Sequence, residues 1–304
     1  MSETVSAVAA DRPIVSLGEL QRAWQAVQSG RFRSPARAET TARTRDHAAA
    51  TSGSAGEWYP AEAVIPVLGA GGGVGTTILA LALASVSTAP ARVVECCSAA
   101  ASGLASASTA ELGATDSGWR RGLREGQHHR ILLERAASPI TAADAVPLPT
   151  DPDRPVAVTF LDCGWDLDHL LAHGWITHQV TSAPAVVVAA RATIPGLRRL
   201  EITLETLRVD HVVAGVLGPR RKRWGRRIEG SLGPATRHLD DIEAVVEIPL
   251  DRALGVYGLS ATPLPQPVLA AASQLLDHLR PAPAPPGHGH GHGHGAGLEV
   301  AVPD

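Results

Sequence analysis

The sequence of 304 residues contains one lysine, one methionine, three cysteines and few aromatic residues, which make up 3% of the chain. Because aromatic side chains are so scarce, a hydrophobic core must be built from Ala, Val, Leu and Ile. Hydrophobic residues make up 44% of the chain, so such a core can be large. Short runs of small aliphatic residues are typical of buried parallel strands covered by helices.

The sequence also lacks the features of disulfide-stabilised, membrane-spanning and secreted proteins. Two of the cysteines, Cys96 and Cys97, are adjacent, so we expect no disulfide framework and predict a reducing, cytoplasmic environment. No apolar run is long enough for a membrane span, and the first residues lack the apolar core of a signal peptide. The net charge of −3 implies no general attraction to nucleic acid.

Composition divides the chain into three parts. Residues 1–60 hold a short amphipathic helix, expected at residues 16–28, and then a linker rich in Arg, Ala, Ser and Gly. Three apolar side chains share one face of that helix: Leu20, Trp24 and Val27. The helix either docks into the groove of a partner protein or packs on its own domain. Residues 61–280 form the main domain, and residues 281–304 are a Pro-, Gly- and His-rich tail expected to be disordered.

Within the main domain, apolar segments with the character of strands alternate with helices. We expect strands at residues 64–68, 92–96, 131–133, 156–161, 185–190, 211–217 and 244–248. We expect helices at residues 77–86, 194–207 and 268–279. This alternation predicts an α/β fold with a doubly wound, mostly parallel sheet.

The most informative stretch is the glycine-rich segment at residues 69–77, which reads Gly-Ala-Gly-Gly-Gly-Val-Gly-Thr-Thr. Glycines permit positive φ, so successive N–H groups can point into one concavity, and the following helix adds partial positive charge. A phosphate site is therefore predicted at Gly71, Gly72, Gly73, Val74, Gly75, Thr76 and Thr77. The hydroxyl of Thr77 stands where it can bind Mg²⁺. The alternative is a tight turn with no ligand.

The segment resembles the deviant Walker A motif of ParA/MinD-like P-loop ATPases, Lys-Gly-Gly-x-Gly-Lys-Thr-Thr followed by an Ala- and Leu-rich helix. The match needs no gap, but both motif lysines are missing. Gly71 stands at the signature lysine, which contacts the nucleotide of the partner subunit, and Thr76 stands at the loop lysine. Because the loop lysine neutralises phosphate charge, the resemblance implies binding of ATP and Mg²⁺ with weak or absent hydrolysis. It also implies a homodimer, but Gly71 cannot make its contact across subunits.

Later segments follow the order of the same family, and the resemblance covers about residues 62–280. A strand ending at Asp162, with Gly164 two residues on, resembles the Walker B or switch II segment. The resemblance assigns Asp162 to Mg²⁺ and Gly164 to movement of the switch. Read alone, Asp162 equally well caps the end of a strand. Glu95 or, in the other register, Cys97 takes the place of the acidic residue that helps to position the attacking water.

A dense basic run follows the strand expected at residues 211–217. Six of the ten residues from 218 to 227 are positively charged: Arg220, Arg221, Lys222, Arg223, Arg226 and Arg227. Phosphate groups are the natural ligands of an arginine cluster, and nucleic acid, a bound nucleotide and anionic lipid all remain candidates. The alternative is a solvated loop that aids solubility. Many ParA relatives bind DNA through basic surface residues, and the resemblance therefore favours DNA.

Together these features predict a bacterial ParA/MinD-like nucleotide-binding protein or pseudo-ATPase. It would act as a scaffold that positions DNA in plasmid or chromosome partition, or a conjugation or secretion machine. The alternatives are a slow ATPase for DNA partition and a DNA-binding adaptor with no nucleotide role. The expected partners are DNA through the basic run and a protein through the N-terminal helix. The sequence assigns no catalytic residue.

Overall fold

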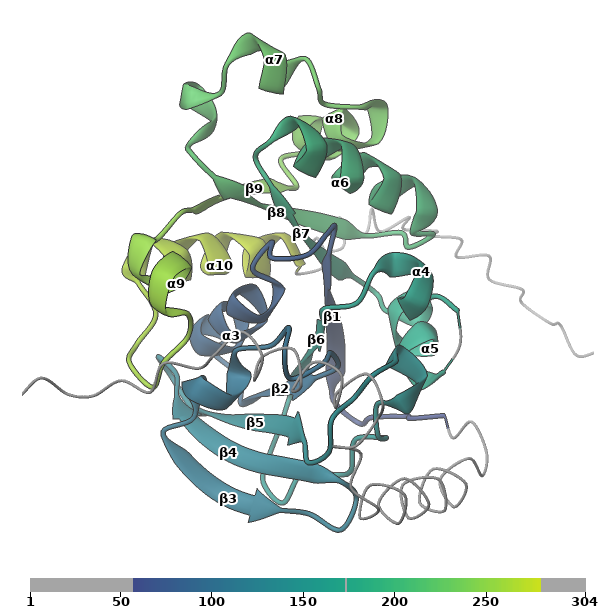
Figure 1. Ribbon diagram of the computed structural model, residues 1–304, viewed down its shortest axis with the longest axis vertical. Helices are drawn as coiled ribbons and strands as arrows, with labels where there is room; N and C mark the ends of the chain where they lie inside the picture. The colour runs from purple at the N-terminus through teal and green to yellow at the C-terminus, as the bar shows by residue number, and fades with distance from the viewer. Residues whose placement is uncertain (1–56, 173, 280–304) are drawn as a thin grey trace, which may run out of the picture. The chain divides into compact units, whose positions relative to one another are not determined.

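The computed structural model describes residues 57–172 and 174–279, which form a unit of three layers with a sheet between two layers of helices (Figure 1). The helix expected at residues 16–28, with Leu20, Trp24 and Val27, lies outside the described residues. So does the Gly-His tail. The expected division of the chain at residues 60 and 280 stays a prediction.

The central layer is a sheet of nine strands in the order β3-β4-β5-β2-β6-β1-β7-β8-β9. The strands are β1 (Ala63–Gly69), β2 (Ala91–Glu95), β3 (Ala110–Ala114), β4 (Trp119–Glu125), β5 (Arg130–Ala136), β6 (Val158–Cys163), β7 (Val186–Arg191), β8 (Val212–Gly218) and β9 (Val245–Pro249). All pairs from β5 to β9 are parallel, and the pairs β3–β4 and β4–β5 are antiparallel. The chain starts in the middle of the sheet and winds to both sides, which confirms the expected doubly wound, mostly parallel fold.

Helices cover both faces of the sheet (Figure 1). On one face α3 (Thr76–Val86) and α10 (Gln266–Leu279) pack with one apolar cluster. On the other face α4 (Leu167–Leu170), α5 (Trp175–Ser182), α6 (Ile194–Thr206) and α8 (Pro234–Asp241) pack with a second cluster. Across the described residues, every helix falls short of the length and apolarity that a bilayer crossing needs.

The antiparallel edge of the sheet is where the expectation was wrong. The strand expected at residues 131–133 is the centre of a longer strand, β5, and β3 and β4 were not predicted. All five residues of β3 are exposed, and β4 carries four charged side chains in Trp-Arg-Arg-Gly-Leu-Arg-Glu. Such strands lack the apolar runs that identify the buried parallel strands. The ladder pairs of the hairpin, together with the buried Trp119 and Leu123 of β4, define this side of the sheet.

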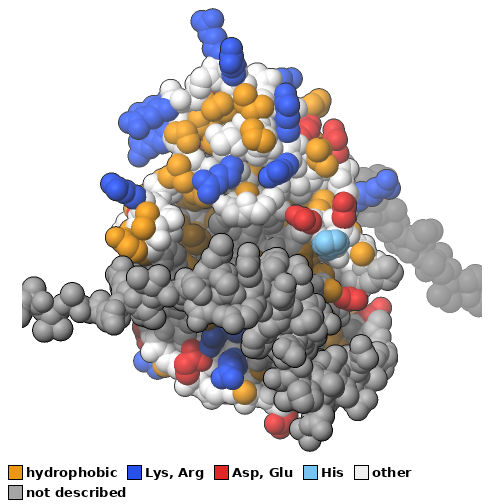
Figure 2. All heavy atoms as spheres, in the orientation of Figure 1, with side chains coloured by type: hydrophobic (Ala, Val, Ile, Leu, Met, Phe, Trp, Pro, Cys, Tyr) orange, Lys and Arg blue, Asp and Glu red, His pale blue; other side chains and the backbone are white. Residues whose placement is uncertain are grey.

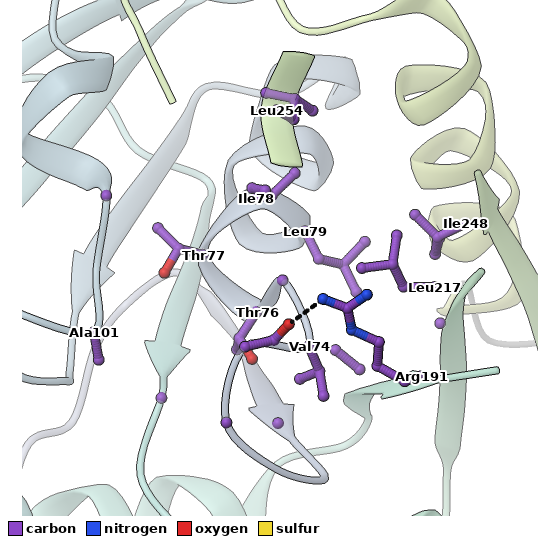
Figure 3. Close-up of a pocket in the computed structure, with 18 of the residues that line it drawn as sticks. Val74, Thr76, Thr77, Ile78, Leu79, Ala101, Arg191, Leu217, Ile248 and Leu254 are labelled. Atoms are coloured by element: carbon purple, nitrogen blue, oxygen red, sulfur yellow. Dashed lines mark hydrogen bonds between the residues drawn. The ribbon is translucent and has the colours of Figure 1, made fainter. Parts of the chain in front are cut away.

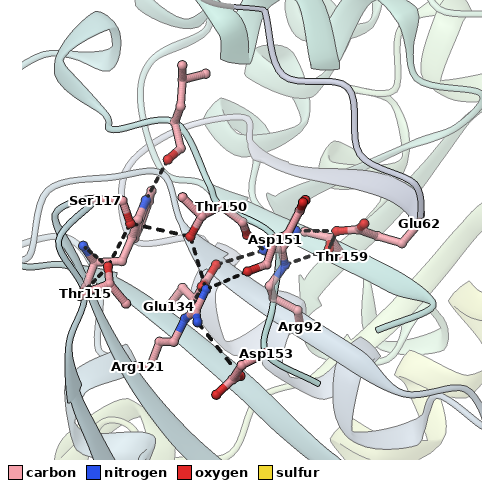
Figure 4. Close-up of polar contacts among 12 residues, drawn as sticks. Glu62, Arg92, Thr115, Ser117, Arg121, Glu134, Thr150, Asp151, Asp153 and Thr159 are labelled. Carbon is pink, nitrogen blue, oxygen red and sulfur yellow. Dashed lines mark hydrogen bonds and ion pairs between the residues drawn. The ribbon is translucent and has the colours of Figure 1, made fainter. Parts of the chain in front are cut away.

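Buried charged side chains connect the strands at the amino-terminal ends of β1, β2 and β6 (Figure 4). Arg92 at the start of β2 pairs with Glu62, which precedes β1, and with Glu134 of β5. It also donates to Thr159 Oγ1 of β6 at 3.0 Å. Arg121 of β4 donates to the second oxygen of Glu134 at 2.8 Å. This network and the glycine loop therefore lie at opposite ends of the strands, because the loop follows the carboxyl end of β1.

Candidate phosphate-binding site

The glycine loop connects β1 to α3, as expected. Gly73 has φ +68° and Gly75, the N-cap of α3, has φ +89°. Both values lie in the left-handed region, which glycine adopts at little cost. Thr76 and Thr77 form the first turn of α3, so the loop ends at a helix N-terminus. This is the backbone arrangement in which N–H groups and the helix dipole attract phosphate.

The loop forms one wall of a cavity of about 730 Å³, a size typical of small-molecule sites (Figure 3). The cavity is lined by all seven predicted phosphate-site residues, Gly71 to Thr77. Residues from other elements complete it: Trp165 after β6, Arg191 of β7, Leu217 of β8 and Leu254 of α9 (Arg252–Tyr257). The sequence therefore predicted one wall of the cavity, and strands, loops and α9 supply the others.

Asp162 lies near the carboxyl end of β6, which was expected to end at Asp162 and continues to Cys163, and it is completely buried. Its Oδ1 atom has no hydrogen-bond partner, while its Oδ2 atom lies 3.6 Å from Cys97 Sγ. Burial raises the pKa of Asp162 to about 7, and a polar interaction with Thr77 opposes that rise. Leaving a buried polar atom unpaired costs free energy, so an unpaired carboxylate oxygen beside a hydroxyl fits the oxygen-ligand chemistry of Mg²⁺.

Three of the residues at motif positions, Thr76, Glu95 and Cys97, are also buried. Thr76, at the loop-lysine position, packs against Gly69, because a Cβ atom built on Gly69 would lie 2.7 Å from Thr76 Oγ1. Glu95 and Cys97, the two alternatives for the water-positioning residue, are buried and do not line the cavity. Burial raises the pKa of Glu95 and of Cys97. Neither side chain therefore reaches the cavity.

Two arginines at the loop were not assigned from the sequence. Arg191 Nη2 donates a 3.1 Å hydrogen bond to the carbonyl oxygen of Gly73 (Figure 3, dashed line). Arg199 of α6 lies over Gly71, with its Nη1 atom 3.0 Å from the place of a Cβ atom on that residue. The signal in the sequence was weak, since these arginines stand more than a hundred residues beyond the loop. Only the neighbourhood of β1 and β7 in the sheet brings them there.

The basic run lies on η3 (Arg221–Arg223), on α7 (Arg226–Glu229) and in the turn before them. Arg220, Lys222, Arg223, Arg226 and Arg227 are exposed. Figure 2 shows Lys and Arg side chains gathered at the top of the view, where Figure 1 places α7. Arg221 differs from the others, because its guanidinium pairs with Glu229 and Asp240. Five of the six predicted residues therefore present their charge to solvent.

No protein-family model matches the sequence, and no curated protein matches it. Many solved structures are similar in the arrangement of their elements, among them the following three. A ParA family ATPase from Chlorobium tepidum is 15% identical, with 71% of this chain and 98% of that chain covered and a TM-score of 0.42. A putative plasmid partition protein from Borrelia burgdorferi bound to AMPPNP is 10% identical, with 71% and 97% covered and a TM-score of 0.41. The cell division ATPase MinD of Pyrococcus furiosus is 14% identical, with 72% and 99% covered and a TM-score of 0.40.

Because these identities and TM-scores are low, the assignment of the fold rests on the chain's own strand order and loop geometry. A glycine loop with left-handed Gly73 and Gly75 leaves the carboxyl end of a central parallel strand and enters a helix. In open α/β sheets, ligands bind at this edge, where the strand connections diverge to the two sides. The described residues thus form a doubly wound α/β fold of the P-loop kind, with a cavity at the phosphate loop.

Proposed function

We propose that this protein binds a nucleoside triphosphate with Mg²⁺ at the glycine loop and hydrolyses it slowly or not at all. One observation carries the proposal: the left-handed turns at Gly73 and Gly75 border a cavity of about 730 Å³, and Thr77, which lines that cavity, interacts with the buried carboxylate of Asp162. The Walker-like motif makes ATP the expected nucleotide. As in the ParA/MinD-like proteins that the motif resembles, the biological role would be to position DNA, or a conjugation or secretion machine.

The residues present favour binding over turnover. Backbone N–H groups between Gly71 and Thr77 would hold the phosphates, and Thr77 and Asp162 would hold Mg²⁺, which neutralises phosphate charge. Thr76 brings no positive charge to the loop, and the sole lysine of the chain, Lys222, is in the basic run. Glu95 does not line the cavity, and its polar interactions are with Ser102 and the backbone of Ala136, whereas Asp162 interacts with the cavity-lining Thr77; Glu95 is therefore not placed to position a water. A protein that binds nucleotide without hydrolysing it efficiently is suited to act as a nucleotide-responsive scaffold.

The test is calorimetric titration of the full chain with Mg-ATP, using Gly75→Asp as the disabling variant. Aspartate at this position is strained by roughly 1–2 kcal/mol at positive φ, and its carboxylate repels phosphate. Gly225→Asp is the matched control, since Gly225 has φ −78° and a Cβ atom there meets nothing within 4 Å. We expect binding to the wild type and the control and none to Gly75→Asp. Absence of binding to the wild type contradicts the proposal.

The exposed basic run favours a second candidate, a DNA-binding adaptor that does not respond to nucleotide. Its test is double charge reversal at Arg223 and Arg226, compared with the same reversal at two exposed arginines of the other sheet edge, Arg120 and Arg130. Only the first pair should weaken binding to duplex DNA, and it should reduce the slope of log affinity against log salt by about 2. DNA binding that is unchanged by Mg-ATP favours the adaptor. DNA binding that Mg-ATP strengthens favours the scaffold.

A further inference from the structure

Two guanidinium groups flank the phosphate loop without belonging to it. Arg191 is the last residue of β7, lines the cavity and is bonded to the carbonyl oxygen of Gly73. Arg199 lies in α6 and fills the space above Gly71 that a side chain at that position would take. Gly71 is the position of the missing signature lysine. The structure therefore places positive charge from β7 and α6 where the loop has lost its own.

The sheet fixes the position of Arg191. β1 pairs with β7 so that Gly69 lies opposite Ala189, and the N–H of Ala70 continues the ladder with a 2.8 Å bond to the carbonyl of Ala189. β1 ends at Gly69, whereas β7 continues for two residues beyond Ala189 and ends at Arg191, whose side chain reaches the carbonyl oxygen of Gly73. The arginine thus leaves the sheet beside the loop because of strand register, and loop flexibility is not needed to bring it there.

The turn after β7 fixes the start of α6, and with it Arg199. Thr193 caps the helix by accepting a 3.1 Å hydrogen bond from the N–H of Gly196. A Cβ atom on Gly196 would lie 2.4 Å from the carbonyl oxygen of Arg191, so glycine is required for this close approach. One helical turn after Gly196, the side chain of Arg199 reaches back over Gly71, since helical side chains point toward the helix N-terminus.

Both guanidiniums are available to a ligand. The ion pairs within residues 57–172 and 174–279 include none that involves Arg191 or Arg199, and both residues are exposed. An arginine has five N–H donors, and the bond to Gly73 uses one of those on Arg191. The planar fork of a guanidinium matches two oxygens of a phosphate group. Arg191, which lines the cavity, and Arg199, which lies over Gly71, therefore have the donors and the charge that a polyphosphate needs.

We propose that Arg191 and Arg199 bind the phosphates of the nucleotide. From β7 and α6 they replace the positive charge of the two motif lysines that are missing at Gly71 and Thr76. This inference rests on the proposed nucleotide binding. It names two residues that raise the affinity for the nucleotide. It also defines the ligand class, because two cations beside an amide-lined loop favour a di- or triphosphate over a monophosphate. The chain would then have relocated its phosphate-binding cations while keeping the glycine loop.

The experiment measures the affinity for Mg-ATP, Mg-ADP and AMP at several salt concentrations, with the full chain. The test variant is Arg191→Gln with Arg199→Gln. The matched control is Arg198→Gln with Arg208→Gln, which removes one exposed arginine from α6 and one from the loop after it. A third variant, Arg191→Lys with Arg199→Lys, keeps both charges. The unfolding temperature of each ligand-free variant shows whether packing has changed.

We expect the glutamine pair to weaken Mg-ATP binding by about tenfold or more, to weaken AMP binding less, and to flatten the salt dependence. The control should bind as the wild type does, and the lysine pair should keep most of the affinity. Three results overturn the inference while the proposed function stands: wild-type affinity in the glutamine pair, an equal loss in the control, or a loss with unchanged salt dependence. A wild type that binds no nucleotide overturns both.

Discussion

The guanidinium of Arg92 donates a 3.1 Å hydrogen bond to the carboxylate of Glu134, and the side chains are only 1% and 0% exposed. Glu134 also accepts from Arg121, and Arg92 lies 5.4 Å from the centre of the Trp58 ring. These contacts connect β2, β4 and β5 with the segment before β1. The network is far from the loop along β1 and β2, so it is suited to holding the sheet rather than to binding a ligand.

Arg92→Leu should therefore destabilise the fold strongly. The substitution leaves the buried Glu62 and Glu134 with less compensating charge, and breaking a buried pair from one side costs about 3–5 kcal/mol. Chemical unfolding measures the loss. The control is Arg130→Leu, which removes an ion pair with Glu125 in which both side chains are about two-thirds exposed, at 66% and 64%. That change should cost less than about 1 kcal/mol. If both variants lose the same free energy of unfolding, the buried network stabilises the fold no more than an exposed ion pair does.

Glu201 of α6 should make stability depend on pH. Its carboxylate accepts hydrogen bonds from the N–H groups of Ala235 and Thr236, at 2.7 and 2.9 Å, and from the Thr236 hydroxyl at 2.7 Å. Partial burial raises the pKa of Glu201, but these bonds outweigh that effect and hold the pKa below its ordinary value. A lowered folded-state pKa means that the stabilisation is complete above the unfolded-state pKa and is lost as pH falls through the folded-state pKa.

Glu201→Gln should accordingly lower the free energy of unfolding by about 1–2 kcal/mol at neutral pH and by less in acid. Urea unfolding at a series of pH values measures both. The control is Glu205→Gln, an exposed carboxylate of the same helix. If both variants show the same pH dependence, the first turn of α8 does not depend on the Glu201 carboxylate.

Asp162→Asn should remove the Mg²⁺ dependence of nucleotide binding. Asparagine has nearly the same shape but no charge, and the unpaired Oδ1 of Asp162 is the atom that fits the ion. Calorimetry with and without Mg²⁺ measures the difference. Asp166→Asn is the control, because Asp166 is an exposed carboxylate that lines the cavity, whereas Asp162 is buried and interacts with Thr77. A variant at position 162 that still responds fully to Mg²⁺ places the ion elsewhere.

Trp165 should report nucleotide binding by fluorescence. It lines the cavity, and its Nε1 atom is buried without a hydrogen-bond partner among the described residues. Because indole emission depends on polarity and hydrogen bonding, we expect Mg-ATP to change the spectrum of the wild type. The change should vanish in Trp165→Phe and persist in Trp224→Phe, since Trp224 lies in the basic run and donates to the carbonyl of Pro219. An unchanged response in Trp165→Phe would separate the binding site from this cavity.

Much of the fold could be predicted because its parallel strands carry local signals. The strands expected at residues 64–68 and 185–190 agree with β1 and β7 to within a residue at each end, since both are apolar runs bounded by polar or glycine residues. The short helices α4, α5, α7 and α8 were missed, and their sequences are too brief or too polar for a clear helical period. The hairpin of β3 and β4 was missed for the same kind of reason, because charged side chains hide its alternation.

The sequence by itself determined the glycine loop, because left-handed turns at Gly73 and Gly75 depend on residue type and on immediate neighbours. It also determined that the loop lacks both lysines. Only the tertiary structure decided that Arg191 and Arg199 lie against this loop and that Asp162 is buried with an unpaired oxygen. It also decided that Arg221 forms ion pairs with Glu229 and Asp240 instead of adding its charge to the exposed basic run. Charge and burial at a site arise from strands and helices that are distant in the chain, and sheet order brings these elements together without leaving a local signal in the sequence.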